Sequence, residues 1–424
     1  MTEASSARGA MTGAAPGRGS MTGAAPGRGS MTGAAPGRGS ILNVDALRAV
    51  EFPWTVASDR AYLNNASTGP LTVRAARASD AITADRLEPF NISDERNFAM
   101  LARTRDLIAR LIGARTGEIA LLTNTTYGLN IAARTLPFRT GDVVLIHDRE
   151  FPANVYPWMA LERDGVVVRR IPAAGALADE EALLRAIDGP NVRAVSVSWV
   201  SFATGFKADL ARIGRACRER GIYFVVDAIQ GLGADVLDVG ACAIDILACG
   251  GQKWLLSPWG SGFAYVREAL VQQLAPAPVG WMAVRGSDDF TRLLDYDCTW
   301  REDARRFEVI TIPFQDIAGL GASLDLLHEL GPAAVAARVA GLATRIVDWA
   351  LGARDVVLVT PRDPARRAGI VAVEPRDAVA TSARLKAAGV AHSLREGAIR
   401  LSPHVYNTEQ EVDRALTVFE GGGA

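Results

Sequence analysis

The sequence lacks the residue patterns on which most metal centres and exported folds depend. Its four cysteines form no C-x-x-C pair and have no histidines at ligand spacing, so neither a zinc site nor a disulfide framework is predicted. It also lacks a run of about 18 apolar residues and an apolar signal core near its first residue. We therefore expect a cytoplasmic protein with no bound metal and no membrane contact.

An excess of one charge is missing as well. The 46 basic and 47 acidic residues give a net charge of -1, which provides no electrostatic reason to expect a nucleic-acid partner. Of the 424 residues, 49% are hydrophobic and 22% are charged, which is typical of a globular protein with a large interior. That length predicts two or three domains, or one doubly wound core with a satellite domain.

The first forty residues are a low-complexity repeat. The unit MTGAAPGRGS occurs three times in succession after a degenerate copy, MTEASSARGA. Units this small and polar bury too little apolar surface to offset the entropy of ordering, so we predict a disordered tail over residues 1–40. Its composition favours a duplicated coding segment over a flexible arm that binds acidic partners.

From residue 41 onward, short β-branched runs alternate with helical periodicity, which is typical of an α/β fold with a parallel sheet. A capped amphipathic segment, DLARIGRACRERG at 209–221, connects two of these runs as a βαβ unit. Long Ala- and Leu-rich helices then precede a smaller α/β region, so we predict a large domain over 41–314 and a small C-terminal domain over 315–424. The expected strands are 118–122, 143–147, 192–200, 223–227, 245–248, 356–360, 370–373 and 398–402, and a closing helix is expected at 408–419.

Lysine is scarce in this chain, because only Lys207, Lys253 and Lys386 stand among the 46 basic residues. A lysine amine can lose its proton and form a Schiff base, whereas an arginine can do neither. Lys207 and Lys386 lie in polar sequence and fit surface positions. Lys253 follows a strand and two glycines and precedes three apolar residues, in IDILACGGQKWLLSPWGSG. A lysine that snorkels from a strand end is the alternative there, and it fits poorly.

A second polar residue, Asp227, ends the apolar run YFVVD. Ligands of open α/β sheets bind beyond the carboxyl ends of the strands, so we expect Asp227 and Lys253 to face one crevice. An aspartate can hold a proton on a ligand's ring nitrogen and a lysine can bind its aldehyde. Those two groups are what the chemistry of pyridoxal 5'-phosphate (PLP) requires. A turn or helix-capping aspartate is the alternative.

A phosphate cradle is expected in TNTTYGLNIAARTL, directly after the strand EIALL. Asn124, Thr125 and Thr126 place hydroxyls and free amides at a helix N-terminus, where the backbone dipole favours an anion. An ordinary capped helix start is the alternative.

These segments, in this order, resemble the class V aminotransferase family of PLP-dependent enzymes, which includes cysteine desulfurases, isopenicillin N epimerase-like proteins and kynureninases. The resemblance covers about residues 62–416. Its strongest block, VVDAIQGLGADVLDVGACAIDILACGGQKWLLSPWGSG, is similar to the family's D-x-x-Q strand and lysine loop. It implies the PLP-dependent transferase fold type I, in which helices flank a mainly parallel sheet and a smaller C-terminal α/β domain follows.

The resemblance also implies roles at the cofactor ring. Lys253 would carry the Schiff base, Asp227 would pair with the ring nitrogen, and Gln230 would approach the phenolic oxygen. Phe151, in EFPANVYPW, matches a position whose side chain stacks on the ring, with ordinary core packing as the alternative.

Further roles concern the phosphate and the substrate. By resemblance, Thr125, Thr126 and Gln252 would contact the phosphate, and Thr311 would reach the phosphate of a neighbouring subunit. Arg400, in AIRLSPHVYNTEQ, would bind the substrate carboxylate bidentately, with a surface arginine as the alternative.

The sequence departs from the family pattern at several positions. Phe151 stands where a histidine is frequent and Phe202 where an asparagine is usual, so Ser201 or Gln230 must hold the phenolic oxygen. A desulfurase needs a persulfide-carrying cysteine shortly before the carboxylate-binding arginine, and no cysteine follows Cys298. The standard desulfurase reaction is therefore not expected.

We predict a PLP-dependent enzyme that acts on an amino-acid substrate by transamination or by β-elimination such as C–S cleavage, in a homodimer with shared active sites. An epimerase of the isopenicillin N epimerase type and a non-catalytic PLP-binding protein are the alternatives. A nicotinamide-dependent dehydrogenase is disfavoured, because Val236 replaces the third glycine of a dinucleotide fingerprint.

Overall fold

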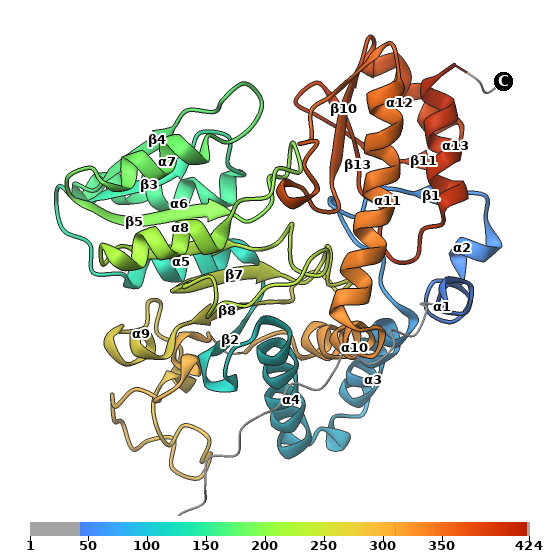
Figure 1. Cartoon of the computed structure of the whole chain (residues 1–424). Coiled ribbons are helices and arrows are strands. Elements are labelled where there is room, and N and C mark those ends of the chain that lie inside the picture. The colour runs from blue at the N-terminus through green and yellow to red at the C-terminus, as the bar shows by residue number, and fades with distance from the viewer. Residues whose placement is uncertain (1–42, 310, 422–424) are drawn as a thin grey trace, which may run out of the picture. The chain divides into compact units, whose positions relative to one another are not determined.

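A seven-stranded sheet forms the centre of the fold (Figure 1). The computed structural model describes residues 43–309 and 311–421, which belong to one compact unit; the tail predicted over 1–40 lies outside the described residues. The strands follow the order β2-β8-β7-β6-β5-β3-β4, and only β8 runs antiparallel to its neighbours. The mainly parallel sheet predicted from the sequence is confirmed. Its strands are β2 (Ile119–Leu122), β3 (Val143–His147), β4 (Val167–Ile171), β5 (Val192–Ser198), β6 (Tyr223–Asp227), β7 (Ile246–Gly250) and β8 (Gly262–Val266).

Both faces of this sheet are buried, because successive residues of a strand point to opposite sides. In β2, Leu121 belongs to one hydrophobic core, which it shares with helices α4, α7 and α8, whereas the adjacent Leu122 belongs to a second core with α5. A sheet covered in this way is exposed only at its strand ends, and that is where ligands can reach it.

Several helix starts carry the capping residues that the sequence indicates. Asp209 caps α8, and Thr408 caps α13 in a reciprocal capping box with Glu411. The helices are α1 (Val44–Glu51), α2 (Trp54–Ala57), α3 (Val73–Leu87), α4 (Asp94–Ile112), α5 (Thr125–Thr135), α6 (Tyr156–Met159), α7 (Glu180–Ile187), α8 (Leu210–Glu219), α9 (Glu268–Gln273), α10 (Phe314–Leu330), α11 (Pro332–Gly352), α12 (Ala378–Ala387) and α13 (Glu409–Phe419).

A second, antiparallel sheet lies in the C-terminal part, in the order β12-β13-β10-β9, and packs with α11, α12 and α13 (Figure 1). The short strand β1, near the start of the described chain, pairs in parallel with β11. The N-terminal segment therefore lies against the C-terminal part of the fold. The strands involved are β1 (Ala61–Tyr62), β9 (Val356–Leu358), β10 (Val371–Pro375), β11 (Val390–Ala391), β12 (Ser393–Arg395) and β13 (Ala398–Leu401).

Helices α10 and α11 link the two regions. Helix α10 packs on α3 and α4, while α11 packs on β9, β10 and α13. A domain division near residue 315 stays a prediction. In the described part of the chain no single helix is long and apolar enough to cross a membrane, and α10 with α11 reaches that length only as a pair bent by 82°.

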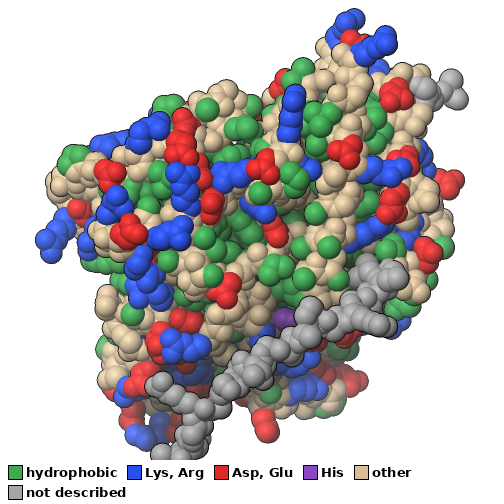
Figure 2. Space-filling view, viewed as in Figure 1, with side chains coloured by type: hydrophobic (Ala, Val, Ile, Leu, Met, Phe, Trp, Pro, Cys, Tyr) green, Lys and Arg blue, Asp and Glu red, His purple; other side chains and the backbone are tan. Residues whose placement is uncertain are grey.

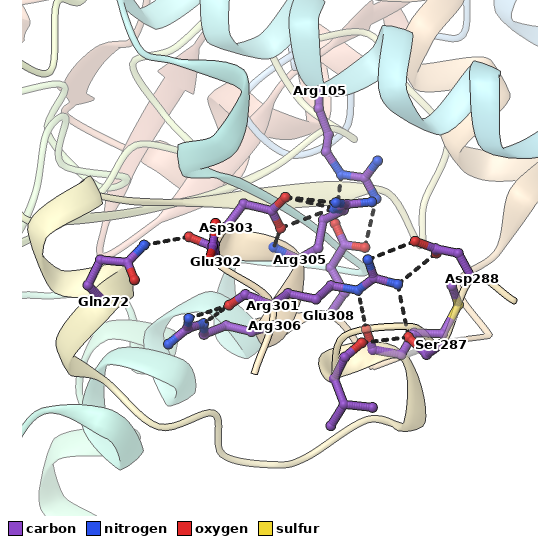
Figure 3. A network of polar contacts seen from close by, with 12 residues as sticks. Arg105, Gln272, Ser287, Asp288, Arg301, Glu302, Asp303, Arg305, Arg306 and Glu308 are labelled. Atoms are coloured by element: carbon purple, nitrogen blue, oxygen red, sulfur yellow. Dashed lines mark hydrogen bonds and ion pairs between the residues drawn. The ribbon is translucent and has the colours of Figure 1, made fainter. Parts of the chain in front are cut away.

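Arginine side chains link the segment between β8 and α10 to helix α4 and also join parts of this segment to one another (Figure 3). Arg105 of α4 forms a buried, two-pronged pair with Glu308, with N···O distances of 2.9 and 2.7 Å. Arg301 donates to the Met282 carbonyl at 2.6 Å and pairs with Asp288. On the face shown in Figure 2, acidic and basic side chains are interspersed.

Candidate active site

A cavity of about 270 Å³ lies beyond the carboxyl ends of β2, β3, β5, β6 and β7, as the crevice rule for parallel sheets requires. Segments from both ends of the chain complete its wall. It is lined by Ala66, Ser67, Asn124, Thr125, Thr126, Phe151, Ala153, Phe202, Asp227, Ile229, Gln230, Gln252, Lys253, Arg395 and Arg400. All the predicted site residues except Ser201 and Thr311 are therefore brought together.

Lys253 lies in a tightly packed loop after β7. The Gly69 amide donates to the Gln252 carbonyl at 2.9 Å, and a Cβ at Gly69 would lie only 2.1 Å from the Lys253 carbonyl oxygen. Leu256 has a left-handed backbone, with φ of 54°, which a residue with a side chain adopts only where its surroundings impose it. Desolvation lowers the pKa of the Lys253 amine to about 8, so a substantial fraction is neutral at physiological pH.

Asp227 is the last residue of β6 and is almost completely buried. Its Oδ1 accepts a hydrogen bond from the Ile229 amide at 3.0 Å. Burial raises the pKa of this carboxyl to about 6, while that hydrogen bond and the charge of Lys253 oppose the rise. The carboxylate form therefore predominates at neutral pH and is available to a positively charged ligand group.

Gln230 connects the loop after Asp227 with the loop that carries Lys253 and with the N-terminal segment. Its Nε2 donates to the Ala66 carbonyl at 3.0 Å, and its Oε1 accepts from Nε1 of the fully buried Trp254 at 2.9 Å. The His404 ring packs on Trp254, and its Nε2 contacts the Trp254 carbonyl at 3.1 Å. Burial lowers the pKa of His404 to about 4, so this histidine is neutral and supports the lysine loop.

The N-terminus of α5 opens into the cavity through Asn124, Thr125 and Thr126. The Thr125 hydroxyl accepts from the Gly250 amide at 2.8 Å, which fixes the helix start to the end of β7. The Gln252 Oε1 is buried and has no hydrogen-bond partner among the described residues. A Cβ at Gly250 would lie 2.4 Å from that atom, so the missing side chain leaves room for the amide.

These features fit a bound phosphate. A helix N-terminus offers free N–H groups and a favourable dipole, and an unsatisfied side-chain amide can turn its NH₂ group toward the same anion. Thr125, Thr126 and Gln252 would hold the phosphate of PLP, Asp227 would face its ring nitrogen and Lys253 its aldehyde.

Arg400 is a buried cation without a carboxylate. Its guanidinium donates to Ser393 Oγ at 3.0 Å, to the Phe202 carbonyl at 2.6 Å and to Ser67 Oγ at 2.7 Å, all of which are neutral acceptors. It has no ion pair within residues 43–309 and 311–421. Desolvation and the charge of Arg395 lower its pKa to about 10, so it remains charged at neutral pH. A held guanidinium with free N–H groups suits a substrate carboxylate.

Phe151 stands at the mouth of the cavity, where 43% of its surface is exposed, and so is not an ordinary core residue. Its ring meets Phe202 edge-on, with centroids 5.2 Å apart, and the Lys253 Nζ lies 5.6 Å from its centroid.

The residue before Phe151, Glu150, accepts a hydrogen bond from the Ser198 amide at 2.8 Å and contacts the Ser198 hydroxyl. Burial raises the pKa of Glu150 to about 7.

Two predicted residues lie elsewhere. Ser201 lines a separate cavity of about 20 Å³ beside Glu150, and its Oγ accepts from the Thr204 amide at 3.3 Å. Thr311 is exposed and lines none of the wall described above. The contact of Ser201 with the phenolic oxygen stays a prediction. The contact of Thr311 with the phosphate of a neighbouring subunit also stays a prediction, because it depends on a second copy of the chain.

Sequence reasoning missed Ser67 and Arg395. Ser67 lies in the polar run NNASTGP, whose residues are typical of a simple turn. It reaches the site through contacts of this segment with distant parts of the chain, such as the pairing of β1 with β11. Arg395 is one of many arginines and carries no local signal.

Solved structures share the fold. The chain is similar to the apo structure of a cysteine desulfurase from Thermococcus onnurineus NA1, with a TM-score of 0.80 and 22% identity over 90% of this chain and 98% of that one. The PLP-dependent transferase fold type I predicted from the sequence is confirmed, since this is the fold that such enzymes have. The mainly parallel sheet, with its crevice at the carboxyl ends of the strands, is thus that of a PLP-dependent enzyme of fold type I.

The chain belongs to the class V aminotransferase family, because the family model described as "Aminotransferase class-V" matches residues 93–415. Among its relatives, the "Uncharacterized aminotransferase YcbU" of Bacillus subtilis (strain 168) is 29% identical over 74% of this chain and 81% of its own length. An "Isopenicillin N epimerase" of Streptomyces clavuligerus is 29% identical over 84% of this chain and 94% of its own length. Family members are PLP-dependent enzymes that act on small amino-acid substrates, which confirms the predicted cofactor.

Proposed function

We propose that this chain converts an amino-acid substrate by transamination or by β-elimination such as C–S cleavage, with Lys253 as the residue that binds the aldehyde of PLP. One observation carries the proposal: Lys253, Asp227 and Arg400 line the same cavity as the N-terminus of α5, and Arg400 has no carboxylate partner among the described residues. When bound, PLP supplies an electron-withdrawing ring that stabilises negative charge at the substrate's α carbon.

The residues of this chain divide the remaining tasks. Asp227 holds a proton at the ring nitrogen, which its carboxylate form is able to do at neutral pH. Arg400 binds the α-carboxylate and so orients the α carbon toward Lys253. With a pKa of about 8, the Lys253 amine is suited to accept and return the α proton near neutral pH.

The standard desulfurase reaction is not part of the proposal. The hairpin before Arg400 turns through only Glu396 and Gly397, and its residues include no cysteine. A persulfide-carrying thiol would need a longer loop in order to reach the substrate. The tight turn therefore supports a reaction that leaves no sulfur on the protein.

Epimerisation is the second candidate, and it is supported by the similarity to the isopenicillin N epimerase along most of both chains. An epimerase has to return the proton to the opposite face of the α carbon. Phe151 has no proton to give, so a second donor is needed from elsewhere. A non-catalytic PLP-binding role is the third candidate, and Arg400 argues against it, since cofactor binding alone needs no second buried cation.

A homodimer in the cytoplasm belongs to the same proposal. Trp281, Leu294 and Tyr296 are exposed on the segment between β8 and α10, around a hollow of about 830 Å³, and a second copy of the chain would cover them. In such a dimer Thr311 would reach the partner's cofactor. Sedimentation velocity distinguishes the dimer from a monomer.

Borohydride reduction followed by peptide mass mapping tests the cofactor claim. We expect a pyridoxyl adduct on the peptide that contains Lys253 and none in Lys253→Ala, with the Lys207 and Lys386 peptides as internal controls. An amino-acid panel then separates the reactions. Transamination yields the 2-oxo acid of the intact carbon skeleton without ammonia, β-elimination yields ammonia, the released β substituent and a 2-oxo acid that lacks it, and epimerisation yields the other enantiomer. An adduct on another lysine, or no adduct after incubation with PLP, would contradict the proposal.

A further inference from the structure

Arg395 ends strand β12, in the hairpin whose other strand, β13, carries Arg400. Ser393 stands opposite Arg400 in this hairpin, and Arg395 stands opposite Ala398. Residues two apart on a strand share a face, so Arg395 and Arg400 lie on the same face as diagonal neighbours, about 7–8 Å apart. The turn residues Glu396 and Gly397 have φ of 47° and 85°, the geometry of a two-residue hairpin turn, which holds Arg395 in place.

Arg395 also stands where two cavities meet. It lines the cavity of the candidate active site and an outer cavity of about 590 Å³, and Ser67 is likewise shared between the two. Ser67 is the residue whose hydroxyl accepts from Arg400. A substrate held at Arg400 therefore has room to extend past Arg395 into the outer cavity.

The charge along this path is positive. Lys386 lines the outer cavity with Arg395, and among the described residues its wall contains no acidic side chain. His392 lines it as well, but burial lowers the pKa of this ring, which favours its neutral form. Of the described residues that line the inner cavity, Asp227 alone is acidic, and its charge acts on Lys253. Within the described part of the chain, Arg395 forms no ion pair, and its one hydrogen bond goes to the adjacent Leu394 carbonyl at 3.1 Å.

We propose that Arg395 forms a second anion subsite, so that the substrate is an α-amino acid whose side chain ends in a carboxylate. The inference rests on the proposed function, because Arg400 must hold the α-carboxylate. An anionic side chain on the substrate complements the positive charges of Arg395 and Lys386, whereas a neutral side chain leaves both charges without a partner. The subsite thus selects acidic over neutral amino acids of equal length.

The test compares isosteric substrates with the holoenzyme. We measure kcat/KM and the change in cofactor absorption for L-glutamate against L-glutamine, and for L-aspartate against L-asparagine. The wild type should prefer the acidic member of a pair. In Arg395→Met the kcat/KM for that acid should fall about 10- to 100-fold, the value of a charge-assisted hydrogen bond, while the amide changes less than about threefold.

Two further variants sharpen the result. Arg384→Met removes another exposed arginine, which donates to Thr381 within α12 and lines neither cavity, so kcat/KM for both substrates should stay unchanged. Arg395→Glu reverses the charge and should move the preference toward L-lysine. A retained melting temperature shows that the hairpin still folds.

Failure of the inference differs from failure of the proposed function. If wild type uses acids and amides equally well, or if Arg395→Met weakens both alike, the subsite is wrong and the enzyme assignment stands. If no amino acid changes the absorption of the bound cofactor, the proposed function fails, and the inference fails with it.

Discussion

The indole Nε1 of Trp254 donates a hydrogen bond to Gln230 Oε1 at 2.9 Å, inside the core. This bond ties the residue after the candidate lysine to the loop that follows the candidate aspartate. Because Gln230 also donates to the Ala66 carbonyl, the wall formed by the N-terminal segment joins the same assembly. The relative position of lysine and aspartate is therefore set by side-chain hydrogen bonds as well as by the sheet.

Trp254→Phe should destabilise the protein, because it leaves Gln230 Oε1 buried without a donor. We expect a loss of about 1–3 kcal/mol from that group, with a further loss from the smaller ring. Urea unfolding of the apoprotein measures it. Trp259→Phe is the matched control, since Trp259 is 72% exposed and should change the free energy of unfolding by less than about 0.5 kcal/mol. Equal losses in the two variants would remove the proposed role of the bond.

The reactivity of Lys253 should depend on pH with a midpoint well below that of an ordinary lysine. Burial lowers the pKa of its amine from 10.5 to about 8, so acylation of the apoprotein at this residue should be half-maximal near pH 8. The negative charge of Asp227 favours the protonated amine, so Asp227→Asn should move the midpoint lower still. Peptide mass mapping across a pH series measures both. An upward shift in Asp227→Asn would show that the two groups are not coupled as described.

Gly69→Ala should disturb the lysine loop. The new Cβ would lie 2.1 Å from the Lys253 carbonyl oxygen, and backbone cannot move as a flexible side chain could. We expect a destabilisation of about 1–3 kcal/mol and weaker PLP binding, measured by thermal melts and absorption titration. Gly341→Ala is the control, because a Cβ there meets nothing within 4 Å in helix α11, and it should stabilise by about 0.5–1 kcal/mol. A neutral Gly69→Ala would show that the loop is free to shift.

Arg105→Met should be far more costly than Arg103→Met, although both residues lie on helix α4 and both pair bidentately with a carboxylate. The Arg105–Glu308 pair is buried, and its loss would leave an uncompensated charge at a cost of about 3–5 kcal/mol. Arg103 is 59% exposed in its pair with Asp325, so its loss should cost at most about 1 kcal/mol. Denaturant unfolding of the two variants measures the contrast, and similar values would mean that water reaches Glu308.

The strands with the strongest apolar runs could be predicted from the sequence. Residues 143–147 and 223–227 have the expected bounds, and other expected strands shift by one or two residues at their ends. In the central sheet, strands β4 and β8 were not predicted, and neither were the short strands β1, β11 and β12. Strand β4 is an edge strand whose sequence, VVRRI, contains two exposed arginines, so its apolar pattern is weak. Strand β8 directly follows the lysine loop, and its first residue is part of that loop's motif.

Site residues were predictable where a polar side chain follows a buried strand, as with Asp227, Thr125 and Lys253. The position after β5 was harder, because the turn that begins at Ser201 places Phe202 rather than Ser201 against the cavity. Arg395 depends on hairpin pairing and on contact between distant segments, and no local pattern encodes either of these.

The pairing of β1 with β11 has a consequence for synthesis on the ribosome. Ala61 pairs with Val390, which is synthesised about 330 residues later. At a translation rate of about 5–20 residues per second, that delay is roughly 15–65 seconds. Throughout that time the N-terminal segment has no strand to pair with. Translation that stops before the last hairpin thus yields a chain that has the lysine loop and lacks Arg400, the residue proposed to bind the substrate carboxylate.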